Sequence, residues 1–193
     1  SVQRESQTYA SVTFQNYYFR VNSDFFFPIG WYGGRGGDLA NIRAAGANVV
    51  LNYWNGIIDD YLPVGSRIYD ASHYVMALQS YLDDAWAESL RVFVHLPTHD
   101  ISGSALINNS FIQTVVGSSI QNHPALLGWY QADEPEQNYT PAIDSTFLIN
   151  RYNTIKGADI NHPVLVVFAN SKDFADGFPE SSLPRFYDVL MAD

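Results

Sequence analysis

The strongest constraint on the fold of this chain is a repeated order of short apolar runs and longer segments with helical periodicity. The runs are almost entirely apolar instead of alternating in polarity, which is typical of parallel strands whose two faces are both covered. Six such runs cover residues 25–30, 48–53, 91–96, 126–130, 163–168 and 187–192. The pattern therefore predicts an α/β fold around a parallel sheet.

Segments with helical spacing separate these runs. Asp38 is expected to cap a helix over residues 39–45, which Gly46 ends. Further helices are predicted over residues 103–121 and 141–157, and the longest amphipathic segment covers residues 70–90. The apolar face of that segment is predicted to consist of Tyr74, Leu78, Tyr81, Leu82, Ala85 and Trp86.

Two architectures fit this order, an open doubly wound sheet and a (β/α) barrel. A nucleotide-binding open sheet is expected to carry a GxGxxG fingerprint after its first strand. Glycines are frequent over residues 30–37, but Trp31, Tyr32 and Arg35 break that spacing, and no GxxxxGK[ST] motif occurs. We therefore favour a (β/α)8 TIM-barrel type fold, with about six β/α units in this chain.

The N-terminal part differs from this rhythm. Residues 1–16 are polar, and two aromatic runs, 17–21 and 25–27, flank Asn22-Ser23-Asp24, which predicts a hairpin. We expect residues 1–24 to form a small β extension that covers one end of a partial barrel at residues 25–193. Because the chain starts at Ser1 without an apolar leader, we expect a processed chain or an excised fragment.

Composition excludes several classes of function. The net charge is −10 and no apolar run approaches the ~20 residues of a membrane span, so neither nucleic acid nor a membrane is an expected partner. The chain has no Cys, which excludes disulfides, iron–sulfur clusters and thiol catalysis. Its 12 Phe, 13 Tyr and 4 Trp are enough to fill a core and also to stack on sugar rings.

Polar and aromatic residues follow the predicted strands, and a barrel would gather them on one rim. Aromatic faces, amides, an imidazole and carboxylates suit a carbohydrate, although each aromatic residue could equally be loop packing. The predicted substrate-binding residues are Trp31, Tyr32, Asn52, Trp54, His95, Asp133 and Asn170. His95 and His99 are poor metal ligands because Pro97 separates them, so we expect no metal and no cofactor.

The sharpest local feature is the sequence Gly-Trp-Tyr-Gln-Ala-Asp-Glu-Pro at residues 128–135. Adjacent side chains of an extended strand point to opposite sides, so only one of Asp133 and Glu134 can face the barrel centre. If Glu134 faces an aromatic floor, burial would raise its pKa and suit it to general acid catalysis. The alternative is that both carboxylates begin a solvated loop.

This stretch resembles the fourth-strand motif of the large clan of retaining (β/α)8 glycoside hydrolases, in which Asn-Glu-Pro supplies the acid/base. Residues 26–32, 39–50 and 123–130 are similar to other parts of the same enzymes, and the likeness covers residues 25–193. The resemblance implies that Glu134 donates a proton to the leaving oxygen and later acts as the base for water.

The chain departs from that family in two ways. Asp133 stands where the family has an Asn that holds the sugar 2-hydroxyl; an ionised Asp accepts hydrogen bonds only, and its charge would raise the pKa of Glu134. The family's nucleophile is a Glu after strand seven, and no residue of this chain matches it. A missing C-terminal segment or a neighbouring chain is therefore expected to complete the barrel.

Three functions are compatible with the sequence. The first is a glycoside hydrolase that cleaves O-glycosidic bonds of a poly- or oligosaccharide, and the second is a non-catalytic carbohydrate-binding or structural module of an extracellular assembly. The third, an unrelated barrel enzyme such as a lyase or isomerase, would normally show a phosphate or metal site. Glycosylation sequons at Asn108 and Asn138 fit a secreted protein.

Overall fold

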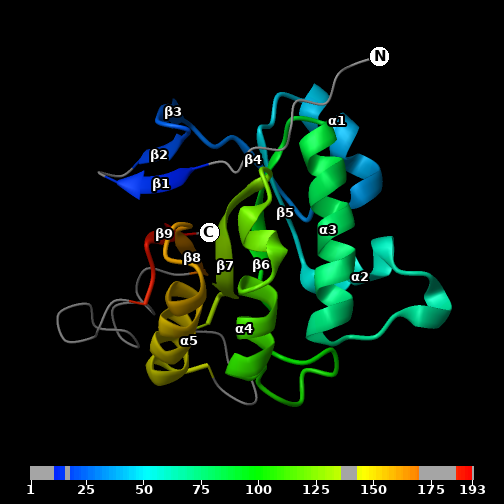
Figure 1. The fold of residues 1–193 in the computed structure, drawn as a ribbon, viewed down its shortest axis with the longest axis vertical. Coiled ribbons are helices and arrows are strands. Elements are labelled where there is room, and N and C mark those ends of the chain that lie inside the picture. Colours follow the sequence, from blue (N-terminus) through cyan, green and yellow to red (C-terminus); the bar gives the residue numbers. More distant parts are fainter. Residues whose placement is uncertain (1–10, 16–17, 136–142, 170–185, 193) are drawn as a thin grey trace.

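A computed structural model describes residues 11–15, 18–135, 143–169 and 186–192 of the chain. Six parallel strands form a curled sheet in which each strand pairs with the next one in sequence (Figure 1). A doubly wound sheet would reverse this order, so the structure confirms the predicted TIM-barrel type fold as a half-barrel. The strands are β4 (Gly30–Tyr32), β5 (Val49–Asn52), β6 (Arg91–His95), β7 (Leu126–Asp133), β8 (Val164–Phe168) and β9 (Val189–Ala192).

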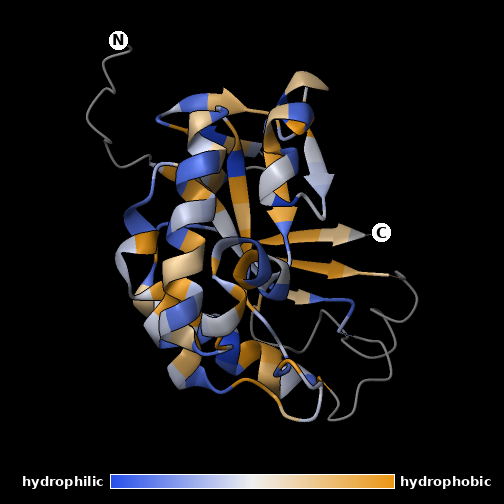
Figure 2. Ribbon diagram, turned by 90° about the vertical axis from the view of Figure 1, so that its right-hand side faces the viewer, coloured by the Kyte–Doolittle hydropathy of each residue, from blue (hydrophilic) through white to orange (hydrophobic). Residues whose placement is uncertain are grey.

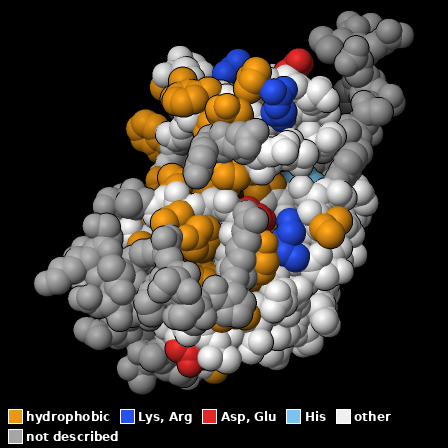
Figure 3. Space-filling view, turned by 90° about the vertical axis from the view of Figure 1, so that its left-hand side faces the viewer, with side chains coloured by type: hydrophobic (Ala, Val, Ile, Leu, Met, Phe, Trp, Pro, Cys, Tyr) orange, Lys and Arg blue, Asp and Glu red, His pale blue; other side chains and the backbone are white. Residues whose placement is uncertain are grey.

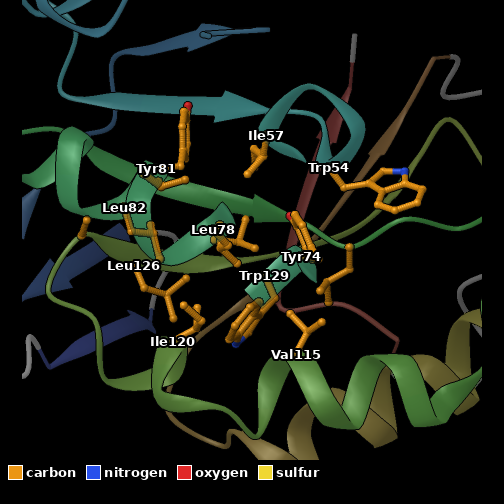
Figure 4. Close-up of a cluster of buried hydrophobic side chains, with 14 of the residues drawn as sticks. Trp54, Ile57, Tyr74, Leu78, Tyr81, Leu82, Val115, Ile120, Leu126 and Trp129 are labelled. Atoms are coloured by element: carbon orange, nitrogen blue, oxygen red, sulfur yellow. The ribbon is translucent and has the colours of Figure 1, made fainter. Parts of the chain in front are cut away.

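Helices cover the outer face of this sheet, and the main core lies between the two layers (Figure 4). The strands are mostly hydrophobic because they bury side chains on both faces, whereas the helices also carry hydrophilic residues (Figure 2). The helices are α1 (Leu39–Ala44), α2 (Trp54–Tyr61), α3 (Ala71–Ala87), α4 (Asn109–Val116) and α5 (Ser145–Ala158), with 3-10 turns at Gly36–Asp38, Val64–Ser66 and Ser119–Asn122.

Helix α3 follows the predicted amphipathic pattern with one exception. The Asp70 side chain accepts a hydrogen bond of 2.9 Å from the backbone N–H of His73 and so caps the helix. Tyr74, Tyr81 and the smaller apolar residues of the predicted face are buried. Trp86 was expected on that face but is 37% exposed, and its ring lies 4.8 Å from the guanidinium carbon of Arg91.

The helix predicted over residues 103–121 is wrong in its first part. The Asp100 carboxylate accepts hydrogen bonds from the Ser102 hydroxyl and from the backbone N–H of Ser104, both of 2.9 Å, and holds a turn in place of a helix. Helix α4 starts only after Asn108, whose side chain accepts from the N–H of Phe111 at 3.0 Å. Asp38 also differs from expectation, since its side chain makes no capping hydrogen bond to α1.

The first strand was predicted over residues 25–30, and the structure divides this run between two sheets. Asn22 and Ser23, with φ of 52° and 73°, form the tip of the predicted hairpin, and β3 (Asp24–Phe26) therefore pairs with β2 (Tyr18–Val21). Strand β4 starts later, at Gly30. With β1 (Val12–Gln15), these strands form an antiparallel sheet.

This N-terminal sheet covers one end of the half-barrel interior. Val12, Phe19 and Val21 are buried in one cluster with side chains from β5, β6, β7, β8 and β9. The rings of Phe19 and Phe93 lie 5.6 Å apart with an edge-to-face geometry. The inner face of the half-barrel therefore has an apolar floor at this end, and its polar residues lie toward the other end.

Candidate active site

The inner face of the half-barrel encloses a hollow of about 400 Å³. Alternate residues of each strand point inward, and most of those that line the hollow are apolar. Figure 3 views the molecule from the side of β9 and shows hydrophobic side chains gathered on this face. The residues that line the hollow are Phe19, Pro28, Gly30, Trp31, Tyr32, Val49, Leu51, Phe93, Leu165, Val167, Val189 and Met191.

Three tyrosines and one carboxylate meet at the carboxyl ends of the strands. The Tyr53 hydroxyl donates a hydrogen bond of 2.7 Å to Oδ2 of Asp133, and the Tyr130 hydroxyl donates to Oδ1. The hydroxyls of Tyr32 and Tyr53 are also hydrogen-bonded to each other. We call Tyr32, Tyr53, Tyr130 and Asp133 the phenol–carboxylate cluster.

An irregularity in β7 brings Tyr130 and Asp133 to the same side. Strict alternation would place residues 130 and 132 on one face and residue 133 on the other. The pairing with β8 shifts register between Tyr130 and Ala132, and Ala132 packs in a cluster with Leu148 of α5. Asp133 consequently lies on the inner side with Tyr130, and the Tyr130 hydroxyl donates a hydrogen bond to the Asp133 carboxylate.

The tyrosine hydroxyls of the cluster remain hydrogen-bond donors at neutral pH. Burial is the main cause that raises the pKa of Tyr53, and hydrogen bonds to Tyr32 and Asp133 raise it further. Burial and the hydrogen bond to Asp133 raise the pKa of Tyr130 as well. Burial also raises the pKa of Tyr32. The Asp133 carboxylate is therefore held by groups that can only donate to it.

His95 lies beside this cluster in its neutral form. Its ring centroid is 5.1 Å from that of Tyr53 and 5.5 Å from that of Tyr130. Burial, and then the charge of Arg151, lower its pKa to about 3 against the opposing effect of Asp133. The backbone N–H of Trp54 donates to Nδ1 at 3.3 Å, which assigns the proton to Nε2. His95 can therefore donate a hydrogen bond but does not gain a proton near neutral pH.

Glu134 directly follows β7 and is partly buried. Its φ of 42° lies in the left-handed region, which is uncommon for a residue with a side chain. The backbone N–H of Glu134 donates to the carbonyl of Val167 at 2.8 Å and so fixes this turn to β8. Strained backbone of this kind clusters at functional sites, which makes Glu134 a candidate on structural grounds as well.

The structure brings together some of the predicted site residues and separates others. Trp31 and Tyr32 line the hollow and are 54% and 52% exposed, while His95 and Asp133 lie at the carboxyl ends of β6 and β7. Trp54 is not part of this group.

Trp54 packs in the core between sheet and helices, where its ring contacts Tyr69 and Tyr74 (Figure 4). Asn52 is buried, and its Oδ1 would lie 2.9 Å from a Cβ at Gly56, so its amide faces α2. Asn170 and the sequon residue Asn138 lie outside the described residues. Asn108 is exposed and caps α4.

The site residues predicted from the sequence do not include Tyr53, Tyr130 or Arg151. The spacing of apolar residues around Tyr130 is that of an ordinary buried strand, and it does not indicate the register shift in β7. Arg151 is fully buried in α5, and its Nη2 donates to the Pro97 carbonyl at 2.7 Å. No group of three or more metal-ligating side chains occurs in the described ranges, and no helix described there is long and apolar enough to cross a membrane.

A curled parallel half-barrel with this order of strands has the TIM-barrel type of fold. Similar solved structures include an endo-1,4-β-mannanase from Eisenia fetida, with 18% identity and a TM-score of 0.58 over 88% of this chain. A β-mannanase from Mytilus edulis matches at 14% identity and 0.58 over 94%. A β-glucuronidase from Parabacteroides merdae matches at 11% identity and 0.57 over 95%.

This chain spans 64% and 68% of the two mannanases and 22% of the glucuronidase. At such identities the likeness concerns the fold. No protein-family model matches the sequence, and no curated protein matches it either.

Proposed function

We propose that this protein is a glycoside hydrolase that cleaves O-glycosidic bonds of a poly- or oligosaccharide by acid/base catalysis. The observation that carries the proposal is the position of Glu134, which follows β7 with a left-handed backbone beside the phenol–carboxylate cluster. Tyr32 of this cluster also lines the hollow, where the exposed rings of Trp31 and Tyr32 offer faces on which a sugar ring can stack.

Glu134 donates its proton to the leaving oxygen and afterwards takes a proton from the attacking water. The retaining reaction also needs a second carboxylate at about 5–5.5 Å from the first. Since the chain has no match to the strand-seven glutamate of the resembling enzymes, the segment or chain that completes the barrel supplies this nucleophile. Strands β4 and β9 are the outer strands of the described sheet and offer their free edges for this completion.

Four predicted residues surround the sugar in this proposal. Trp31 and Tyr32 present exposed rings for its CH faces, and Asp133 and the Nε2–H of His95 meet its hydroxyl groups. Trp54 and Asn52 act through packing, because they lie on the helix side of the sheet.

The test is the E134Q variant of the full-length protein, assayed on a panel of aryl β-glycosides. Loss of a general acid/base lowers kcat by about 10²–10⁴-fold. The control is E88Q, because Glu88 follows the C-terminal end of α3 and precedes the amino end of β6, opposite the carboxyl ends of the strands. An E134Q variant that keeps the rate of the E88Q variant contradicts the catalytic assignment.

A non-catalytic carbohydrate-binding or structural module of an extracellular assembly is the second candidate. The observation that favours it is Asp133 in place of the family's Asn, together with the open edge of the half-barrel. Binding on a glycan array without turnover of any bound glycan supports this module. Both candidate functions include a secreted protein that is glycosylated at Asn108. We expect the mass of the natural protein to fall when its glycans are removed enzymatically.

A further inference from the structure

Two hydroxyl protons of the phenol–carboxylate cluster are committed to Asp133. A tyrosine hydroxyl has a single proton to donate, whereas an ionised carboxylate only accepts hydrogen bonds. The Tyr53 hydroxyl donates its proton to Oδ2 of Asp133 at 2.7 Å, and the Tyr130 hydroxyl donates its proton to Oδ1. Neither phenol therefore has a proton left to donate to a ligand.

The proton of Tyr32 is committed within the cluster as well. The hydroxyls of Tyr32 and Tyr53 are hydrogen-bonded to each other, and Tyr32 is the donor because the Tyr53 proton goes to Asp133. All three phenols keep their protons at neutral pH, since burial raises the pKa of each. The four described side chains of the cluster consequently offer lone pairs to a ligand and no proton.

A ligand in the hollow can reach these lone pairs. Tyr32 lines the hollow and is 52% exposed, and Asp133 is partly exposed. A carboxylate can accept about four hydrogen bonds and a phenol oxygen about two, so the bonds within the cluster do not use its full acceptor capacity. A ligand group that meets the cluster must therefore be a hydrogen-bond donor.

His95 places a donor beside these acceptors. The backbone N–H of Trp54 donates to Nδ1, which leaves the proton of the neutral ring on Nε2, and the ring lies 5.1 Å from that of Tyr53. The Tyr74 hydroxyl donates to the His95 carbonyl at 2.7 Å and so fixes the end of β6. A hydroxyl group can donate to the cluster and accept from Nε2–H, whereas an ammonium group only donates and an ether oxygen only accepts.

We propose that the phenol–carboxylate cluster determines substrate specificity: Tyr53 and Tyr130 position the Asp133 carboxylate so that the site selects a sugar with a free hydroxyl group at one ring position. The inference rests on the carbohydrate substrate of the proposed function and deepens it, because it names the chemical feature of the sugar that is recognised. A sugar in which this hydroxyl is missing or substituted leaves the polar groups of the site unsatisfied and is rejected.

The first test measures binding to the E134Q variant of the full-length protein, which prevents turnover. The probes are the aryl β-glycoside of the panel that binds most tightly and its monodeoxyfluoro analogues, one for each ring hydroxyl. Fluorine is close to a hydroxyl group in size but has no proton to donate. By calorimetry we expect one analogue to bind more weakly than the parent glycoside by about tenfold or more. Equal affinities of all analogues overturn the inference.

Y53F and Y130F, made in the E134Q background, test the positioning role. Each variant removes one of the donors that hold the Asp133 carboxylate. We expect the affinity for the parent glycoside to fall by about threefold to tenfold while the affinity for the rejected fluoro analogue stays the same, so that selectivity is lost. A structural role alone would weaken both ligands equally, and that result contradicts the proposal.

The matched control is Y69F in the same background. The Tyr69 hydroxyl also donates to a carboxylate, Oδ1 of Asp59 at 2.7 Å, but this pair lies outside the cluster. Y69F should keep both affinities. Selectivity that persists in Y53F and Y130F as it does in Y69F overturns the inference and leaves the hydrolase function standing. Selective binding without turnover of any glycoside by the unmodified protein overturns the hydrolase function and leaves the inference standing, whereas binding of no glycoside overturns both.

Discussion

At the scale of single residues, His95 couples the site to the stability of the fold. Its folded pKa of about 3 lies below the ordinary value of 6.5, so the unfolded chain binds more protons between these limits. Stability therefore falls as the pH drops from 6.5 toward 3, by about 1.4 kcal/mol for each pH unit at most. Above pH 6.5 this contribution is complete and constant.

The H95Q variant lacks this titration, so its unfolding free energy should depend less on pH between 6.5 and 3. Urea unfolding at a series of pH values measures the two slopes. His123, whose pKa burial also lowers, is present in both proteins and contributes equally to both. Equal slopes would show that His95 is not held neutral by the fold.

The sequence indicated some of the site residues because their chemistry can be read without the fold. Asp133 and Glu134 stand out as paired carboxylates before a Pro, and Trp31 stands out as an aromatic residue beside a strand. The direction of each side chain could not be read in the same way. The register shift after Tyr130 turns Asp133 inward, and it depends on pairing with β8, which is distant in sequence.

At the scale of elements, α1 and α3 show the difference between a capping residue type and a capping contact. Asp70 bonds to the N–H of His73, and this donor is the largest cause that lowers the Asp70 pKa to about 2. D70A should lower the unfolding free energy by about 1 kcal/mol at neutral pH. The difference should shrink as the pH falls through the folded pKa, where the carboxylate is protonated and the capping contribution is lost.

D38A is the matched control, because Asp38 stands before α1 but makes no capping hydrogen bond. It should change the unfolding free energy by less than about 0.5 kcal/mol. Urea unfolding of both variants checks the pair. A D38A cost as large as that of D70A would contradict the contact-based account.

The elements most easily predicted are those with a long local pattern. Helix α3 follows from its periodicity, and the five parallel strands from β5 to β9 follow from their continuous apolar runs. Errors occur where a short side-chain contact competes with the helix, as in the turn around Asp100. The run at residues 25–30 was misassigned because two sheets share it, and the hairpin at Asn22 decides the division.

At the scale of the whole molecule, the N-terminal sheet and the half-barrel share one apolar cluster. A boundary between residues 24 and 25 was predicted where the alternation of strands and helices begins, and β3 (Asp24–Phe26) crosses this position. Phe19 is 5% exposed and packs its ring against Phe93 of β6. Because this contact joins the two sheets, we expect them to unfold together in a single transition.

The comparison of F19A with F25A tests this coupling. F19A removes a buried ring from the shared cluster and should lower the unfolding free energy by about 3–5 kcal/mol. Phe25 is 69% exposed and contacts the Arg20 guanidinium at 4.0 Å, so F25A should cost about 1 kcal/mol or less. Urea unfolding followed by far-UV circular dichroism and by tryptophan fluorescence measures both effects. If F19A costs no more than F25A, or if the two signals separate, the N-terminal sheet is an independent unit and the floor of the hollow is not fixed by it.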